Sequence, residues 1–260
     1  GGGSMSERIL DVKNVTKRFG GLVALDQVTL HVDSGEIVGL IGPNGAGKTT
    51  LFNTVAGAFY ATSGTVLYCG KDITRMSPNH RCHMGIGRTF QITKPFGNMT
   101  VLENVSVGAL YGRSERPHDL SQQAKKRSLE EAEEILKMMH LDNKKDAKAS
   151  TLNVPERKRL EICRALATNP KLLLLDEVIA GLNPSEVGGM VELIREVNQT
   201  GISILMIEHV MKAVMGLSHR IYVLNFGKLI AQGTPEEITS NPTVIEAYLG
   251  KIGQKEAKKC

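Results

Sequence analysis

The sequence predicts an α/β fold in which helices cover a largely parallel β-sheet, and three observations predict it. Strand-like and helix-like segments alternate between residues 171 and 217, which is typical of a parallel sheet covered by helices. A glycine-rich loop, residues 42–49, follows an apolar strand-like segment and precedes a helix-like one. A long amphipathic segment, residues 120–141, interrupts the pattern in the middle of the chain. We therefore expect an α/β core with a helical insertion.

The N-terminal region has the pattern of short strands joined by turns. Residues 9–12 and 28–32 are rich in β-branched side chains and partly alternate in polarity. Gly20-Gly21 and residues 33–35 carry turn signals, and residues 64–73 resemble a further hairpin. We therefore expect short strands joined by turns at this end of the chain. The apolar strand at residues 36–41 then leads into the glycine-rich loop, and residues 49–56 look helical.

The middle of the chain contains two predicted helices. In the first, at residues 120–141, one face carries the apolar side chains Leu129, Ala132, Ile135, Leu136 and Met139. This face either packs on the domain or binds a partner, and packing is the preferred interpretation. A second helix, at residues 157–168, has a broader apolar face.

Beyond Pro170 the predicted elements alternate. Strands are expected at residues 171–175 and 202–207, and helices at residues 185–199 and 211–217. Residues 220–231 have the pattern of a hairpin that turns at residues 225–228.

Composition limits the class of protein. Of the 260 residues, 41% are hydrophobic and 23% are charged, which excludes a mostly disordered chain. No apolar stretch approaches the length of a membrane span. No signal-peptide pattern follows Met5, and residues 1–4 are interpreted as a cloning remnant. We therefore expect a cytosolic protein.

Charge and cysteine usage limit the partners. The net charge is +5, but the basic residues are spread along the chain, aromatic residues make up only 4%, and tryptophan is absent. This argues against a nucleic-acid partner. The cysteines, Cys69, Cys82, Cys163 and Cys260, form no CxxC pair, so reduced thiols are expected rather than disulfides or a structural zinc site.

The strongest motif is a phosphate-binding loop. The pattern G-x-x-x-x-G-K-[ST] is matched by Gly42, Pro43, Asn44, Gly45, Ala46, Gly47, Lys48 and Thr49, with Thr50 next in the following helix. Glycines let the backbone turn its N–H groups toward a polyphosphate, and the helix N-terminus adds partial positive charge. Lys48 would reach the β- and γ-phosphates, and the Thr49 hydroxyl would coordinate Mg²⁺. The alternative is a chance match, which the flanking strand and helix disfavour.

An acidic pair ends a predicted buried strand. Residues 172–175 are all leucine, and Asp176 and Glu177 follow them. Open α/β sheets place ligand groups at the carboxyl ends of their strands. Asp176 would hold Mg²⁺ through water, and Glu177 would polarise the attacking water. The alternative is that the pair serves as helix N-cap and surface carboxylates.

Together these residues resemble the ATPase subunits of ABC transporters. The resemblance rests on the phosphate loop, the Asp176-Glu177 strand, and the segments at residues 17–21, 88–91, 181–184 and 207–209. It implies that Phe19 stacks on adenine and that Gln91 senses Mg²⁺ and the γ-phosphate. It also implies that His209 contacts the γ-phosphate, and that residues 181–184 cross between two ATPase subunits.

The resemblance also implies a fold, ligands and partners. It implies a P-loop NTPase (RecA-like) core with a mixed or parallel sheet, an N-terminal antiparallel β subdomain and an inserted α-helical subdomain. The ATPase domain would span residues 5–240, with the insertion at about 92–165 and a C-terminal helix and tail at 241–260. Implied ligands are ATP and Mg²⁺. Implied partners are separate transmembrane permease subunits and a second ATPase subunit at the cytoplasmic face of the inner membrane.

One stretch departs from the family pattern. The family signature is L-S-G-G-Q, whereas this chain has Leu152-Asn153-Val154-Pro155-Glu156. Pro155 has no N–H to donate to a phosphate held by the partner subunit. Val178 is a further departure, since proline is usual after the catalytic glutamate. These departures favour a heterodimer with two unequal sites over a symmetric, fully active homodimer.

Other segments resemble one subfamily, the ATPases of branched-chain amino-acid importers. They are residues 90–96, 99–105, 180–184, 207–209 and 245–250. The alternatives are the ATPase of a urea-type importer or a lipopolysaccharide exporter, a soluble ATP-gated protein that transports nothing, and a pseudo-ATPase that binds ATP without turnover.

Overall fold

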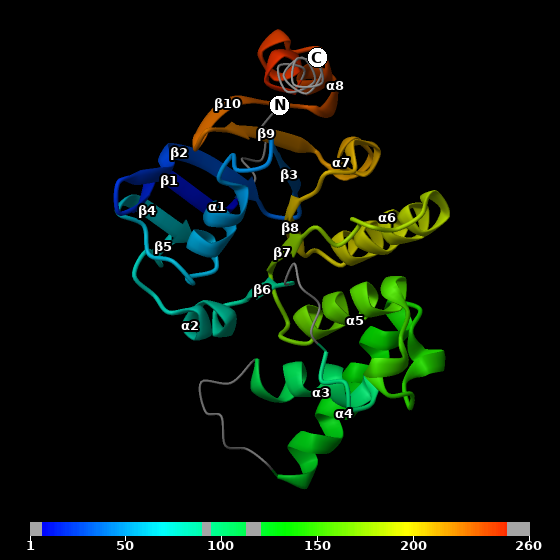
Figure 1. The fold of residues 1–260 in the computed structure, drawn as a ribbon. Coiled ribbons are helices and arrows are strands. Elements are labelled where there is room, and N and C mark those ends of the chain that lie inside the picture. Colours follow the sequence, from blue (N-terminus) through cyan, green and yellow to red (C-terminus); the bar gives the residue numbers. More distant parts are fainter. Residues whose placement is uncertain (1–6, 90–94, 113–120, 249–260) are drawn as a thin grey trace, which may run out of the picture. The chain divides into compact units, whose positions relative to one another are not determined.

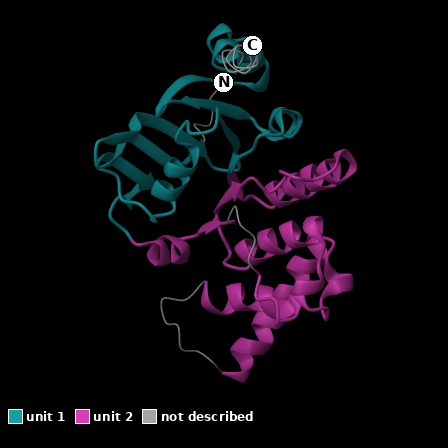
Figure 2. Ribbon diagram, viewed as in Figure 1, with its two compact units in different colours: residues 1–76, 205–260 teal, residues 77–204 magenta. Residues whose placement is uncertain are grey.

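The computed structural model describes residues 7–89, 95–112 and 121–248. Gln91 and Cys260, both singled out from the sequence, lie outside the described residues. The chain divides into two compact units, which Figure 2 shows in different colours. Unit 1 combines residues 1–76 with residues 205–260, and unit 2 comprises residues 77–204. Unit 1 is therefore assembled from both ends of the chain.

Unit 1 contains the predicted antiparallel β region. Its strands are β1 (Arg8–Phe19), β2 (Leu22–Asp33), β4 (Ser63–Tyr68) and β5 (Lys71–Asp72), in the order β2-β1-β4-β5 (Figure 1). The register pairs Val12 with Leu30 on one side and with Val66 on the other. All three side chains are buried. The short strands expected from the sequence are thus parts of longer ones, with the first turn at Gly20-Gly21.

The second sheet of unit 1 carries the glycine-rich loop. Strand β3 (Ile37–Ile41) pairs in parallel with β9 (Arg220–Asn225), which pairs antiparallel with β10 (Lys228–Gly233). On its other side β3 neighbours β8 (Ser203–Ile207), the strand in which the chain passes from unit 2 to unit 1. Helices α1 (Lys48–Val55), α7 (Met211–Leu217) and α8 (Pro235–Thr239) also belong to the unit, and a further helical segment covers residues 242–248. Strands β3, β8 and β9 are almost entirely buried, as expected for strands covered by helices, whereas β10 is partly exposed.

Unit 2 is mainly helical. Its helices are α2 (Pro78–His83), α3 (Val101–Tyr111), α4 (Gln122–Met138), α5 (Val154–Leu166) and α6 (Pro184–Gln199), with two short 3₁₀ turns, η1 (Asp142–Lys144) and η2 (Ala149–Thr151). Helix α3 packs against α4 and α5. Strands β6 (Ile86–Arg88) and β7 (Leu172–Asp176) pair in parallel, with Ile86 opposite Leu172.

The apolar face of α4 is used mostly for packing. Ala132, Leu136 and Met139 are fully buried, as the preferred interpretation required, and Ile135 is half-buried. The expectation was wrong for Leu129, which is 40% exposed, because the buried face of the helix follows Ser128, Ala132 and Leu136 at intervals of four residues and Leu129 lies to one side of it.

Local sequence signals explain where several helices begin. Helices α3, α5, α6 and α8 each start with a capping box, in which the N-cap side chain and a glutamate three residues later satisfy each other's backbone N–H groups. Proline stands in the first turn of α5, α6 and α8, where its missing N–H costs nothing. No helix among the described residues is both long enough and apolar enough to cross a membrane. Cys69, Cys82 and Cys163 are free thiols, and burial raises the pKa of Cys163.

Candidate active site

The predicted phosphate loop lies between β3 and α1 in unit 1, and its glycines are required by the backbone. Gly42, Gly45 and Gly47 have φ of +153°, +79° and +106°. A Cβ atom at Gly42 would lie 2.1 Å from the carbonyl oxygen of Leu224, and one at Gly47 would lie 2.6 Å from that of Ala24. Side chains are therefore excluded at both positions, whereas at Gly45 only the conformation favours glycine.

The lysine of the motif is folded into its own loop. Lys48 is only 6% exposed, and its Nζ donates to the carbonyl oxygens of Gly42 at 2.8 Å and Pro43 at 3.0 Å. It opens helix α1, whose first turn carries no acidic residue. Thr49 and Thr50 follow in the same turn, at the positive end of the helix. This end of the loop is suited to an anion.

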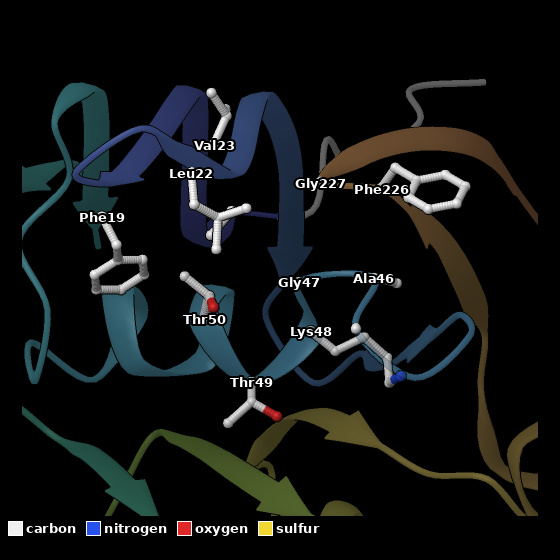
Figure 3. Close-up of a pocket in the computed structure, with 12 residues that line it drawn as sticks. Phe19, Leu22, Val23, Ala46, Gly47, Lys48, Thr49, Thr50, Phe226 and Gly227 are labelled. Atoms are coloured by element: carbon white, nitrogen blue, oxygen red, sulfur yellow. The ribbon is translucent and has the colours of Figure 1, made fainter.

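A pocket of about 370 Å³ lies over the loop in unit 1. It is lined by Phe19, Leu22, Val23, Ala24, Gly45, Ala46, Gly47, Lys48, Thr49, Thr50, Phe226 and Gly227. Figure 3 shows Phe19 on one side and Phe226 on the other, with Thr50, Thr49 and Lys48 between them. An aromatic surface and a cationic, amide-rich loop thus share one cavity.

Phe19, the residue proposed to stack on a base, is held at the end of β1. Its ring meets that of Phe59 edge-on, with the ring centroids 5.2 Å apart. The Lys17 ammonium lies 4.9 Å from the centroid of the Phe19 ring. Phe19 is nevertheless 42% exposed, so a ring surface is available to a planar ligand.

Phe226 was not singled out from the sequence, although it lines the same pocket. It occupies the turn between β9 and β10, is 84% exposed and has φ of +45°. The next residue ties this turn to the phosphate loop, because the Gly227 N–H donates to the Ala46 carbonyl at 2.9 Å. The Gly227 carbonyl accepts from the Asp26 N–H at 2.8 Å. The predicted turn at residues 225–228 was the only signal available.

Asp176, the proposed Mg²⁺ residue, is the last residue of β7 in unit 2 and is 2% exposed. Its backbone N–H donates to the Thr89 hydroxyl at 3.0 Å, and the Thr89 N–H donates to the Leu174 carbonyl at 2.9 Å. The Arg88 guanidinium lies 3.3 Å from a carboxylate oxygen of Asp176. Arg88 is a partner that sequence reasoning missed. The carboxylate is therefore held at a strand end with its charge matched.

Glu177 begins the loop that follows β7. It has φ of +53°, an uncommon conformation for a glutamate, and its carbonyl accepts a 2.7 Å hydrogen bond from the Lys158 Nζ. Neither acidic residue caps a helix, because the N-cap of α6 is Asn183. The alternative interpretation of the pair as helix cap and surface carboxylates was therefore wrong.

The proposed histidine lies in unit 1. His209 is exposed, two residues after the end of β8, and Glu208 between them is buried. Phe19, the phosphate loop and His209 thus belong to unit 1, while Asp176 and Glu177 belong to unit 2. Gln91 lies outside the described residues.

The degenerate signature forms the start of α5, which therefore begins at Val154 rather than at residue 157 as expected. The Asn153 side chain accepts from the Glu156 N–H at 2.9 Å, and the Glu156 carboxylate accepts from the Asn153 N–H at 2.9 Å. Pro155 stands in the first helical turn, and Val154 is exposed. The polar groups of this segment are thus engaged in capping their own helix.

Comparisons with known proteins agree with this geometry. Residues 25–180 match the family "ABC transporter", and residues 228–252 match the family "Branched-chain amino acid ATP-binding cassette transporter". The chain is 43% identical to the "High-affinity branched-chain amino acid transport ATP-binding protein LivG" of Escherichia coli, over 95% of this chain and all of that protein. It is 42% identical to a probable LivG of Archaeoglobus fulgidus, over 94% of this chain and 96% of the other.

Solved structures give the same result. A nucleotide-free ATP-binding cassette of an ABC transporter superposes with a TM-score of 0.84 at 36% identity, covering 93% of this chain and 98% of that one. A cassette in its ADP conformation superposes with a TM-score of 0.82 at 36% identity, covering 94% of this chain and 99% of that one. A dimeric bacterial cassette superposes with a TM-score of 0.76 at 26% identity, covering 87% of this chain and 98% of that one. The predicted fold class is confirmed, and the chain belongs to the ABC transporter family as one of its ATP-hydrolysing cassettes.

Proposed function

We propose that this chain supplies the ATP hydrolysis that drives import of branched-chain amino acids through separate permease subunits. The pocket over the phosphate loop supports the ATPase role, because it joins an exposed aromatic ring to a lysine and a helix N-terminus. The cargo is inferred from relatives that match this chain along nearly its whole length. The chain would act at the cytoplasmic face of the cell membrane, held there by the permeases.

Nucleotide binding is assigned to unit 1. Phe19 stacks on the adenine, and the loop N–H groups from Gly45 to Thr50 surround the phosphates. The Lys48 ammonium leaves the carbonyls of Gly42 and Pro43 and turns to the β- and γ-phosphates. The two carbonyl partners keep the charge solvated until the nucleotide arrives, so the loop need not be rebuilt.

The donors available for Mg²⁺ suit that ion. Thr49 offers a hydroxyl at the pocket, and Asp176 offers a carboxylate at a strand end; Mg²⁺ prefers such oxygen ligands and shares them with substrate phosphates. The Thr49 hydroxyl and the Asp176 carboxylate, the latter through water, would hold the ion together with Gln91. When bound, the ion neutralises charge on the transferred phosphoryl group.

Hydrolysis is assigned to Glu177 and His209. The Glu177 carboxylate orients a water and takes up its proton as the water oxygen bonds to the γ-phosphorus. The bond from that phosphorus to the β–γ bridging oxygen breaks, which leaves ADP and inorganic phosphate. His209 contacts the γ-phosphate and supports the water. The positive φ of Glu177 and the Lys158 bond to its carbonyl fix the backbone that carries this carboxylate.

Two cassettes are proposed to close over two nucleotides, with this chain paired to a different one. A signature segment of the usual kind gives N–H groups to the partner's γ-phosphate, whereas Pro155 has none and Asn153 caps its own helix. The site that this segment completes would be weakened, and the site built on this chain's own phosphate loop would meet an intact signature.

The pairing is tested by restoring the signature, with Asn153→Ser, Val154→Gly, Pro155→Gly and Glu156→Gln in one variant. The ATPase rate of the purified chain alone should rise in the restored variant. Equal rates for the unaltered and restored chains would refute the unequal-site model.

The cargo is tested on the transporter purified with its own membrane subunits and reconstituted in proteoliposomes. Leucine, isoleucine and valine should stimulate ATP hydrolysis and accumulate, while urea should do neither. The Glu177→Gln variant is the control, since it should bind ATP but abolish both hydrolysis and uptake. Stimulation by urea alone, or by lipopolysaccharide, would replace the proposed cargo.

A further inference from the structure

A lysine lies against the ring of Phe19 in unit 1. Lys17 is two residues earlier in β1, and side chains two residues apart in a strand point to the same face. Its Nζ lies 4.9 Å from the centroid of the Phe19 ring and 5.6 Å from that of the Phe59 ring. Both distances are within the about 6 Å at which an aromatic ring attracts an ammonium. One cation is thus shared by two rings that also contact each other edge-on.

The ammonium of Lys17 is held in place by the loop that follows α1. Its Nζ donates to the Tyr60 carbonyl at 2.9 Å. This loop is fixed to β1, because the Thr62 N–H donates to a carbonyl of that strand at 2.8 Å. It is also fixed to α1, because the Phe59 N–H donates to the Asn53 carbonyl at 3.1 Å. The position of the cation is therefore set by backbone groups at both ends of the loop.

The ring of Phe19 keeps a surface open toward the pocket over the phosphate loop. Phe19 is among the residues that line this pocket (Figure 3), whereas Lys17 and Phe59 are not. Phe19 is also partly exposed, while Lys17 and Phe59 are half-buried. The cation and the second ring therefore contact Phe19 from outside the pocket, and the remaining ring surface is free to meet a planar ligand.

A cation beside an aromatic ring changes how that ring stacks. The face of the ring carries partial negative charge, and two such faces repel each other when they stack. The Lys17 ammonium draws π-electron density toward itself and away from the surface that faces the pocket. The repulsion between that surface and the face of a nucleobase is then smaller, and the attraction of the cation also keeps the ring in one orientation.

We propose that Lys17 is a positioning residue of the nucleotide site, which orients the Phe19 ring and polarises it for stacking on a purine base. This rests on the proposed role of Phe19 as the residue that stacks on adenine. Lys17 acts through the ring and touches no phosphate, whereas Lys48 binds the phosphates directly. Each end of the nucleotide is thus recognised with the help of its own lysine.

The first test compares wild type, Lys17→Met, Lys17→Arg and Lys71→Met by calorimetric titration of the full chain with ATP and Mg²⁺. Lys17→Met keeps a long side chain and removes the charge, so Kd for ATP should rise about two- to fivefold. Lys17→Arg should restore the affinity, because a guanidinium also stacks on aromatic rings. Lys71, an exposed lysine of β5, is the control for net charge, and its variant should bind like wild type.

The second test repeats Lys17→Met in the Phe19→Ala background and with inorganic tripolyphosphate, which has no base. The effect of Lys17→Met on ATP binding should disappear without the Phe19 ring, and the affinity for tripolyphosphate should not change. An equal loss with and without the ring, or a loss with tripolyphosphate, would mean that Lys17 attracts the charge of the nucleotide and would overturn the proposal. A lower Tm with an unchanged Kd would assign Lys17 to folding and would also overturn it.

The Phe19→Ala variant separates failure of this proposal from failure of the proposed site. If Phe19→Ala weakens ATP binding but Lys17→Met binds like Lys71→Met, the ring recognises the base and only the role of Lys17 is refuted. If Phe19→Ala binds ATP like wild type, the assignment of Phe19 to the base is itself wrong.

Discussion

The Nζ atom of Lys48 lies 2.8 Å from the carbonyl oxygen of Gly42, six residues earlier in the same loop. This contact and the one to Pro43 bring two backbone carbonyl dipoles to the buried cation. A phosphate with full negative charge binds an ammonium more strongly than a neutral carbonyl does, so an incoming phosphate displaces these two contacts readily.

Lys48→Ala should therefore weaken ATP binding far more than it changes stability. A hydrogen bond to a charged group contributes about 1.5–3 kcal/mol, so Kd should rise roughly ten- to a hundredfold. Lys71→Ala, which removes an exposed lysine of β5, is the control for net charge and should bind ATP normally. Equal affinity for the two variants, measured by calorimetry with ATP and Mg²⁺, would contradict this assignment.

We expect the loss in free energy of unfolding caused by three glycine-to-alanine variants to depend on the space around each glycine and on its backbone conformation. Gly42→Ala meets the Leu224 carbonyl and should lower the free energy of unfolding by about 2–4 kcal/mol. Gly45→Ala meets no atom within 4 Å but needs φ of +79°, so about 1 kcal/mol is expected. Gly216→Ala, in helix α7 with open space around it, should be neutral or slightly stabilising. Urea denaturation of the three variants checks the order, and a Gly42 variant as stable as the Gly216 variant would contradict it.

The signature segment should contribute to stability through its capping box. Asn153→Ala removes the acceptor of the Glu156 N–H and should cost about 1 kcal/mol. Asn153→Ser keeps a side-chain oxygen at the N-cap and should cost much less. Asn183→Ala at the start of α6 is the matched variant, because Asn183 caps the same way and should show a similar loss. If Asn153→Ala left the free energy of unfolding unchanged, the segment would have no structural role to offset its missing donors.

Much of the fold and of the candidate site could be predicted because it depends on local sequence patterns. The strand before the loop, the glycines at positive φ and the leucine strand ending in Asp176 are each set by neighbours in sequence. The capping box of α5 is also a local signal, because Asn153 and Glu156 are three residues apart, although the apolar pattern predicts a helix that starts only at residue 157.

The contacts that were missed join residues far apart in sequence. Arg88 meets Asp176 across the β6–β7 pair, 88 residues further along the chain. No period or spacing in the sequence records such pairs, because they depend on how the strands and helices are arranged in three dimensions. The same is true of Phe226, whose role in lining the pocket depends on the hydrogen bond from Gly227 to Ala46.

We expect the two ends of the pocket to bind different parts of ATP. Phe19 should recognise the base, and Lys48 should recognise the phosphates. Stacking of an aromatic ring on a base contributes about 1–3 kcal/mol, so Phe19→Ala should raise Kd for ATP roughly five- to a hundredfold, while Phe19→Tyr should bind like wild type. Inorganic tripolyphosphate has phosphates but no base. Its affinity should fall in Lys48→Ala and stay unchanged in Phe19→Ala. Calorimetry with both ligands on the same variants is the measurement, and equal weakening of ATP and tripolyphosphate by Phe19→Ala would mean that the ring supports the loop rather than the base.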